Sequence, residues 1–209
     1  MYKRQEAESG QVTAYYFENI DGVPNLYAAM EITNAGTVPA IVESIKVTFN
    51  TGEKTQATTF TPPITQNDII EPGETIQLAL WLPYEEERGK LNAQSAVTAT
   101  AEATLTPVSD SVAQRLVVED ITLLQNYPGF ATVSGTLVNK TSAEDFDLTL
   151  VYLSFYNAED KLIGTYHFTK NLSVPAEESR NFVVHMQSLP IEDICGKTAR
   201  IVARGIGID

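Results

Sequence analysis

The chain has 209 residues and a formal net charge of −13, with one cysteine and two histidines. The acidic balance disfavours binding to nucleic acid or to an anionic membrane, and a single cysteine excludes an internal disulfide. No apolar run reaches the length of a membrane-spanning helix, and no signal peptide is present.

The first five residues look unnatural. Met1-Tyr2-Lys3-Arg4-Gln5 is what GTG TAT AAG AGA CAG encodes when GTG is read as a start codon. This resembles a transposon-end adapter used in preparing DNA libraries. We therefore expect residues 1–5 to be a non-native scar that replaces the natural N-terminus.

Alternation of apolar and polar residues dominates the rest of the chain, and helical periodicity is almost absent. Ile45, Val47 and Phe49 alternate with polar neighbours, as a half-buried strand requires. The pattern predicts strands over residues 11–19, 26–34, 41–50, 55–61, 74–82, 94–105, 115–125, 129–139, 147–157, 162–170, 179–188 and 197–206. Short strands at this spacing predict an all-β protein of two tandem antiparallel immunoglobulin-like β-sandwich domains.

The segments between the strands are short. Turn residues such as Asp21-Gly22 and Pro72-Gly73 separate them, and single helical turns are predicted at 85–90 and 191–194. The strand pattern is interrupted at 106–112, which predicts a first domain at 6–107 and a second at 108–209.

The two halves repeat the same order of features after about 105 residues. The matching positions are Asn34 with Asn139, Asn50 with Asn157, Pro72 with Pro175, and Pro83 with Pro190. Small insertions and deletions keep the register, so the halves are interpreted as a duplicated domain.

One phrase in the second half is similar to a known family. The phrase runs from Val133-Ser-Gly-Thr-Leu-Val-Asn139 through Leu153-Ser-Phe-Tyr-Asn157 and Lys161 to Pro175-Ala-Glu177 and Phe182. It resembles the FxLYD family of β-sandwich domains over about residues 115–206. The chain departs from the family's pattern at three turn positions, Asn157, Asp160 and Ala176. The resemblance implies a domain of bacterial and archaeal envelope proteins, and it supplies no catalytic site.

The same residues also have a physical interpretation. Gly135 inside a strand predicts a bulge or a close backbone approach, and Asn139 at a strand end predicts an Asx turn. Tyr156, placed before a tight turn, is expected to pack across the strands.

Few residues suggest catalysis. His167 and His185 lie on alternating strands without the spacing of a metal site or a triad. Cys195, next to Ile194 and Gly196, is expected at a strand edge or turn as an inert, half-buried thiol. We therefore expect no enzyme, no cofactor and no metal site.

The sequence disfavours two further kinds of site. The acid clusters at 85–87, 144–147 and 159–160 lack the spacing of a calcium loop, so solvated loops are the better interpretation. A Lys–Asn isopeptide bond requires an inward lysine, and Lys46 is out of phase with its apolar neighbours.

Apolar residues in the outward phase give the candidate interaction surface. Trp81 alternates against Leu80 and Leu82, and strand 147–157 is apolar on both phases. An aromatic platform for sugars would combine Trp81 with Tyr84 or Tyr15, whereas a packing contact explains a single Trp equally well. The candidate surface comprises Trp81, Tyr84, Leu148, Leu150 and Tyr152.

The expected function is a non-catalytic, extracytoplasmic structural or protein-interaction module of a prokaryotic cell-surface protein or lipoprotein. Its expected partner is a protein or another cell-envelope component, and its anchor would lie in the missing N-terminus. The alternative is a carbohydrate- or ligand-binding surface module that uses exposed aromatics around Trp81.

Overall fold

The computed structural model describes residues 6–19, 21–52, 54–62, 68–84, 96–108, 115–141, 144–187 and 189–208. The chain forms two compact units, Met1–Ser111 and Val112–Asp209. Apart from one short helix, the described secondary structure is β-strand, and every pairing between strands is antiparallel. The prediction of an all-β antiparallel protein is thus confirmed. No helix in the described ranges is long and apolar enough to cross a membrane.

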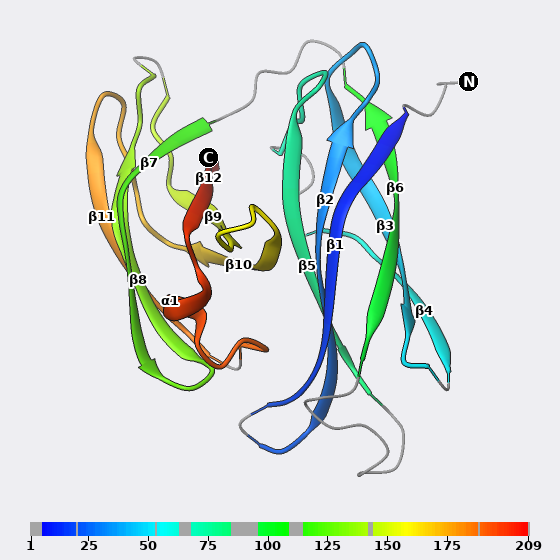
Figure 1. The fold of residues 1–209 in the computed structure, drawn as a ribbon. Coiled ribbons are helices and arrows are strands. Elements are labelled where there is room, and N and C mark those ends of the chain that lie inside the picture. Colours follow the sequence, from blue (N-terminus) through cyan, green and yellow to red (C-terminus); the bar gives the residue numbers. More distant parts are fainter. Residues whose placement is uncertain are drawn as a thin grey trace. The chain divides into compact units, whose positions relative to one another are not determined.

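Unit 1 contains two three-stranded sheets, ordered β1-β2-β5 and β4-β3-β6, which lie face to face (Figure 1). Its strands are β1 (Ala7–Glu18), β2 (Pro24–Asn34), β3 (Ala40–Asn50), β4 (Thr55–Phe60), β5 (Thr75–Pro83) and β6 (Thr98–Pro107). Ile45, Val47 and Phe49 are fully buried while Lys46 is exposed. The alternation seen in the sequence therefore determines which face of β3 forms the core.

Unit 2 contains one six-stranded sheet, ordered β10-β9-β12-β7-β8-β11. Its elements are β7 (Arg115–Tyr127), β8 (Phe130–Val138), β9 (Leu148–Tyr156), β10 (Leu162–Lys170), β11 (Ser179–Met186), α1 (Ile194–Lys197) and β12 (Arg200–Ile208). β7 pairs with β12 at Arg115 and Leu116, and with β8 from Val117 onward. Its register shifts near Asp120, which has a positive φ of 53°. One strand thus joins both halves of the sheet, and the bulge lies a few residues after the point where it changes partner.

The two units share one order of strands. The order β1-β2-β5 recurs as β7-β8-β11, and β4-β3-β6 recurs as β10-β9-β12. In unit 1, where β1 and β6 form no ladder, the Ser9 hydroxyl donates to the Ala101 carbonyl at 2.6 Å and links them. The shared order supports the interpretation of a duplicated plan.

A buried asparagine holds the same turn in both units. Asn34 Nδ2 donates to the carbonyls of Val38 and Ile70, each at 2.9 Å, and its Oδ1 accepts from Gly36 N. Asn139 Nδ2 donates to Glu144 O at 2.8 Å and to Val174 O at 3.0 Å. Its Oδ1 accepts from Thr141 N, two residues on, which is the Asx turn that the sequence predicts.

The turns that precede β5 and β11 correct the predicted match between the two units by one residue. Asn34 N donates to Glu74 O, and Asn139 N donates to Glu178 O. Pro72 therefore corresponds to Ala176 rather than to Pro175. Gly73, with a φ of 78°, corresponds to Glu177, with a φ of 59°. The sequence alignment missed this shift because both turns contain a proline, one residue apart.

Replacing Glu177 by glycine is expected to stabilise unit 2 by about 1 kcal/mol, since glycine adopts positive φ without a steric cost. Replacing Ala176, whose φ is not positive, by glycine is expected to leave the free energy of unfolding unchanged or to lower it. Urea unfolding followed by circular dichroism measures both variants. A gain at Ala176→Gly and a loss at Glu177→Gly would contradict the corrected register.

The remaining differences are local. β1 begins at Ala7, before the predicted start at residue 11, and the helical turn predicted at 191–194 lies instead at Ile194–Lys197. Cys195, which was expected at a strand edge or turn, lies in this four-residue helix. The Asp193 side chain caps the helix by accepting from Gly196 N at 2.9 Å, which explains where the helix begins. The predicted helical turn at 85–90 lies outside the described residues.

Candidate functional site

Three aromatic side chains form a row across the sheet β1-β2-β5. Tyr15 lies directly opposite Tyr27, and Tyr27 lies directly opposite Trp81. The ring centroids are 6.1 Å apart for Tyr15 and Tyr27 and 5.0 Å apart for Tyr27 and Trp81. We call these three residues the aromatic row.

The aromatic row lies on the outward face of its sheet. Along β2 and β5, the same face carries Glu31, Thr33, Thr75 and Gln77, whereas the opposite face carries apolar residues such as Met30 and Leu78. Alternation along a strand places residues two apart on the same face. The outward phase predicted for Trp81 therefore agrees with the polarity of its neighbours.

The aromatic row is only partly open to solvent. Tyr27 is 1% exposed, while Tyr15 and Trp81 are half-buried. Burial raises the pKa of the Tyr15 hydroxyl above its usual value, so this group stays protonated at neutral pH. Flat rings with neutral hydroxyls can pack against apolar surface or against sugar rings while donating hydrogen bonds.

Tyr84 does not join the aromatic row. Its ring meets Tyr16 edge-on at 6.1 Å, and both rings are buried. Tyr16 follows Tyr15 in β1 and so points to the opposite face of the sheet. Burial, and next the Glu18 carboxylate, raise the pKa of Tyr16. Of the two suggested aromatic partners, only Tyr15 shares the sheet face of Trp81, and Tyr27 lies between the two.

The second candidate segment lies on β9 of unit 2. Val151, on one phase of β9, pairs with Phe168, whose ring lies 5.4 Å from the Phe182 ring of β11 in the core. Leu148, Leu150 and Tyr152 occupy the other phase; Leu148 is half-buried and the other two are buried.

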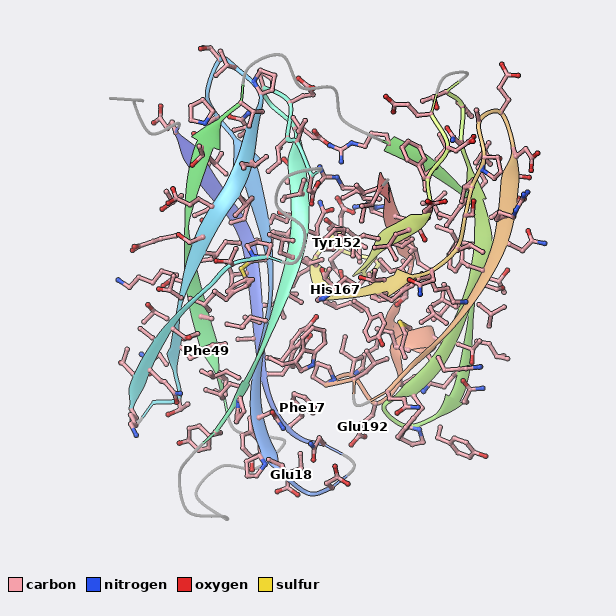
Figure 2. All side chains as sticks on the ribbon, turned by 180° about the vertical axis from the view of Figure 1, so that it is seen from behind. Phe17, Glu18, Phe49, Tyr152, His167 and Glu192 are labelled. Carbon is pink, nitrogen blue, oxygen red and sulfur yellow. The ribbon has the colours of Figure 1, made fainter. Side chains whose placement is uncertain are left out.

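Tyr152 lies between two ionisable neighbours. It pairs with His167 on β10 and with Arg204 on β12, and its ring centroid is 5.7 Å from that of His167 (Figure 2). Burial lowers the pKa of His167 below 6.5, so its imidazole is neutral at pH 7. Period-two alternation could place Tyr152 on its face, but only the strand register shows which residues lie beside it.

The two histidines lie on different parts of unit 2. His167 is on β10, whereas His185 on β11 is exposed and its Nδ1 lies 2.9 Å from Thr132 Oγ1. β10 and β11 are the opposite ends of the strand order. Their described contacts also differ, because the His167 ring lies against Tyr152 of β9, whereas His185 meets Thr132 of β8.

Cys195 is tied into the fold through its backbone. Its N–H donates to Gln125 Oε1 at 3.3 Å, and its side chain is half-buried. Burial, and next the charge of Asp193, raise the thiol pKa above 9.0. A thiol protonated at neutral pH is a poor nucleophile.

The other candidates have structural contacts. Within the described ranges, no group of three or more His, Cys, Asp or Glu side chains could hold a metal ion. Asp145 accepts from Ala176 N at 2.8 Å, and Lys46 lies 3.9 Å from Glu102 at the exposed surface. The acidic run at 85–87 lies outside the described residues.

Sequence reasoning missed Tyr27 as a member of the candidate site. The alternation around Tyr27 is weak, because residues 26–30 are apolar in both phases and all of them are buried. The position of Tyr27 between Tyr15 and Trp81 depends on the register of two ladders, which the alternation does not specify.

The chain matches no protein-family model and no curated protein. Among solved structures, it is similar to red sea bream transglutaminase, with a TM-score of 0.25 and 8% identity over 95% of this chain. It is also similar to the coconut allergen cocosin, with a TM-score of 0.16 and 7% identity over 95% of this chain and 88% of that one. The chain spans 31% of the transglutaminase. Likeness at this level identifies neither a fold family nor a function.

Proposed function

We propose that this chain is a non-catalytic structural or protein-interaction module built from two tandem immunoglobulin-like sandwiches. The observation that carries the proposal is the aromatic row, three rings in register on an outward sheet face. Aromatic residues are enriched in protein contacts because they bury a large area at a small cost in conformational entropy. The shared strand order of the two units supports the tandem arrangement.

The proposed setting is outside the cytoplasm, on a prokaryotic surface protein or lipoprotein. It rests on the similarity of residues 115–206 to FxLYD domains. The test is the genomic sequence encoding the residues before Glu6. An export signal with a lipid-attachment cysteine supports the proposal, whereas a gene without any export signal contradicts it.

A carbohydrate-binding module is the second candidate, and the same row favours it. Sugar rings pack against aromatic faces, and Tyr15 and Trp81 are half-buried rings on either side of the buried Tyr27, so a sugar would contact these two outer rings.

Replacing Trp81 with alanine separates the two functions. On the first proposal, Trp81→Ala lowers the free energy of unfolding by about 2 kcal/mol, because a half-buried ring loses its contacts. In a screen of polysaccharides, the variant and the wild type then bind each polysaccharide equally, or neither binds any. The measurements are urea unfolding and binding to a glycan array.

The matched control is Tyr127→Ala, since Tyr127 is 72% exposed and lies in unit 2. It should change neither measurement. A polysaccharide that binds the wild type and the control, but binds Trp81→Ala at least tenfold more weakly, would overturn the first proposal in favour of the second.

A further inference from the structure

Strand β5 is an edge strand with little of the usual protection against pairing. It ends the order β1-β2-β5, and among the described strands only β2 pairs with it. Its ladder with β2 runs from Thr75 to Pro83 without a bulge, and none of these residues is charged. Edge strands usually carry charges, prolines or bulges that prevent pairing with another chain, and of these β5 has only Pro83, at its end.

The equivalent edge in unit 2 is blocked. There, Lys170 Nζ donates to the Val183 carbonyl of β11 at 2.7 Å. The strand itself also carries Arg180 and His185. An ammonium group on a strand carbonyl prevents an incoming strand from using that acceptor, so the duplicated units differ at this edge.

Apolar surface remains along β5. Leu80, Trp81 and Leu82 are each half-buried, although the alternation predicts Leu80 and Leu82 for the core. A strand added beside β5 would cover these side chains through cross-strand contacts.

We propose that the β5 strands of two copies of this chain pair antiparallel about a two-fold axis at Ala79. This register uses all of Thr75–Pro83 and joins the two sheets into the order β1-β2-β5-β5-β2-β1. The interface is isologous, since the same strand contributes from both copies. This inference does not depend on the proposed function.

The polarity of β5 favours a second copy as its occupant. In this register Leu78 lies opposite Leu80 of the second copy, and Ile76 lies opposite Leu82. The inward face of the joined sheet then pairs apolar residues only with apolar residues. Each chain carries a net charge of −13, so two copies repel one another over most of their surface. The uncharged β5 edge is where they meet without placing acid against acid.

Sedimentation velocity of the whole chain, from about 1 µM to about 500 µM, tests the proposal, because an interface made by one strand from each copy is small and associates weakly. We expect a monomer at the low end and a dimer at the high end. Ala79→Glu places like charges on the axis and should weaken the dimer at least tenfold. The control Val183→Glu, on the edge strand of unit 2, should leave it unchanged. A wild-type monomer throughout, or a dimer that survives Ala79→Glu, overturns the proposal.

Crosslinking tests the register even where Ala79→Glu disturbs the fold. In a Cys195→Ser background, Ala79→Cys places two thiols opposite each other across the axis, with Cα atoms about 4.5–5.5 Å apart, within the range of a disulfide. Gln77→Cys is the control, because its two thiols would be about 13 Å apart along the strands. We expect at least tenfold more covalent dimer from Ala79→Cys. Equal yields from the two variants overturn the register.

Discussion

Replacing Asn139 with aspartate is expected to destabilise unit 2 by about 3–5 kcal/mol, the cost of an unpaired buried charge. Asn139 is 0% exposed, and its Nδ2 donates to the carbonyls of Glu144 and Val174. A carboxylate has the same shape but would place negative charge beside two acceptors. Urea unfolding followed by circular dichroism measures the loss. Since burial raises the pKa of such a carboxyl, we expect the variant to regain stability as the pH falls towards 4.

Two matched substitutions accompany this variant. Asn34→Asp should destabilise unit 1 by a similar amount, and the fluorescence of the chain's single tryptophan, Trp81, follows that unit. Asn157→Asp should change the free energy of unfolding by less than about 0.5 kcal/mol, as is usual at the surface. Its Oδ1 only accepts, from Glu159 N and Lys161 N, and a carboxylate does the same. A large loss at Asn157→Asp, or none at Asn139→Asp, would contradict this account.

Replacing Gly207 with alanine is expected to cost about 3 kcal/mol through overpacking. A Cβ at Gly207 would lie 2.3 Å from Cγ of Phe146. The ring cannot easily withdraw, because Phe146 is fully buried and exchanges backbone hydrogen bonds with Val174. Thermal unfolding measures the loss.

A double-mutant cycle identifies the cause. In a Phe146→Leu background the added methyl has more room, so Gly207→Ala should cost at least about 1 kcal/mol less than in the wild type. Additive losses would show that the cost arises from the backbone of β12 rather than from the ring.

Several packing features of unit 2 could be predicted from the sequence of single strands. Gly135 was expected at a close approach, and a Cβ there would lie 2.9 Å from the Phe182 ring and 3.1 Å from Glu119 O. Tyr156 was expected to pack across the strands, and the Arg200 guanidinium lies 4.0 Å above its ring. The expectation for Gly135 depends on a local conformation, which the residue type limits strongly, whereas the partner of Tyr156 follows from the pairing of β9 with β12.

The candidate site was less predictable. The phase of Trp81 follows from its own strand, but its contact with Tyr27 follows from the pairing of β2 with β5. The suggested partner Tyr84 lies just beyond β5, at 84, and its ring meets Tyr16 instead. Nothing in the alternation of β5 indicates which way the chain turns after its last residue.

The sequence by itself determined the all-β class, the outward or inward phase of most strands, and the paired asparagines that hold a turn in each unit. Alternation and turn chemistry act over a few residues, so they can be read along the chain. The tertiary structure alone decided which strands are edges, that β7 joins both halves of one sheet, and which aromatic rings lie side by side. These features arise from pairing between distant segments, and the period of two that determines a residue's face leaves its neighbour across the ladder unspecified.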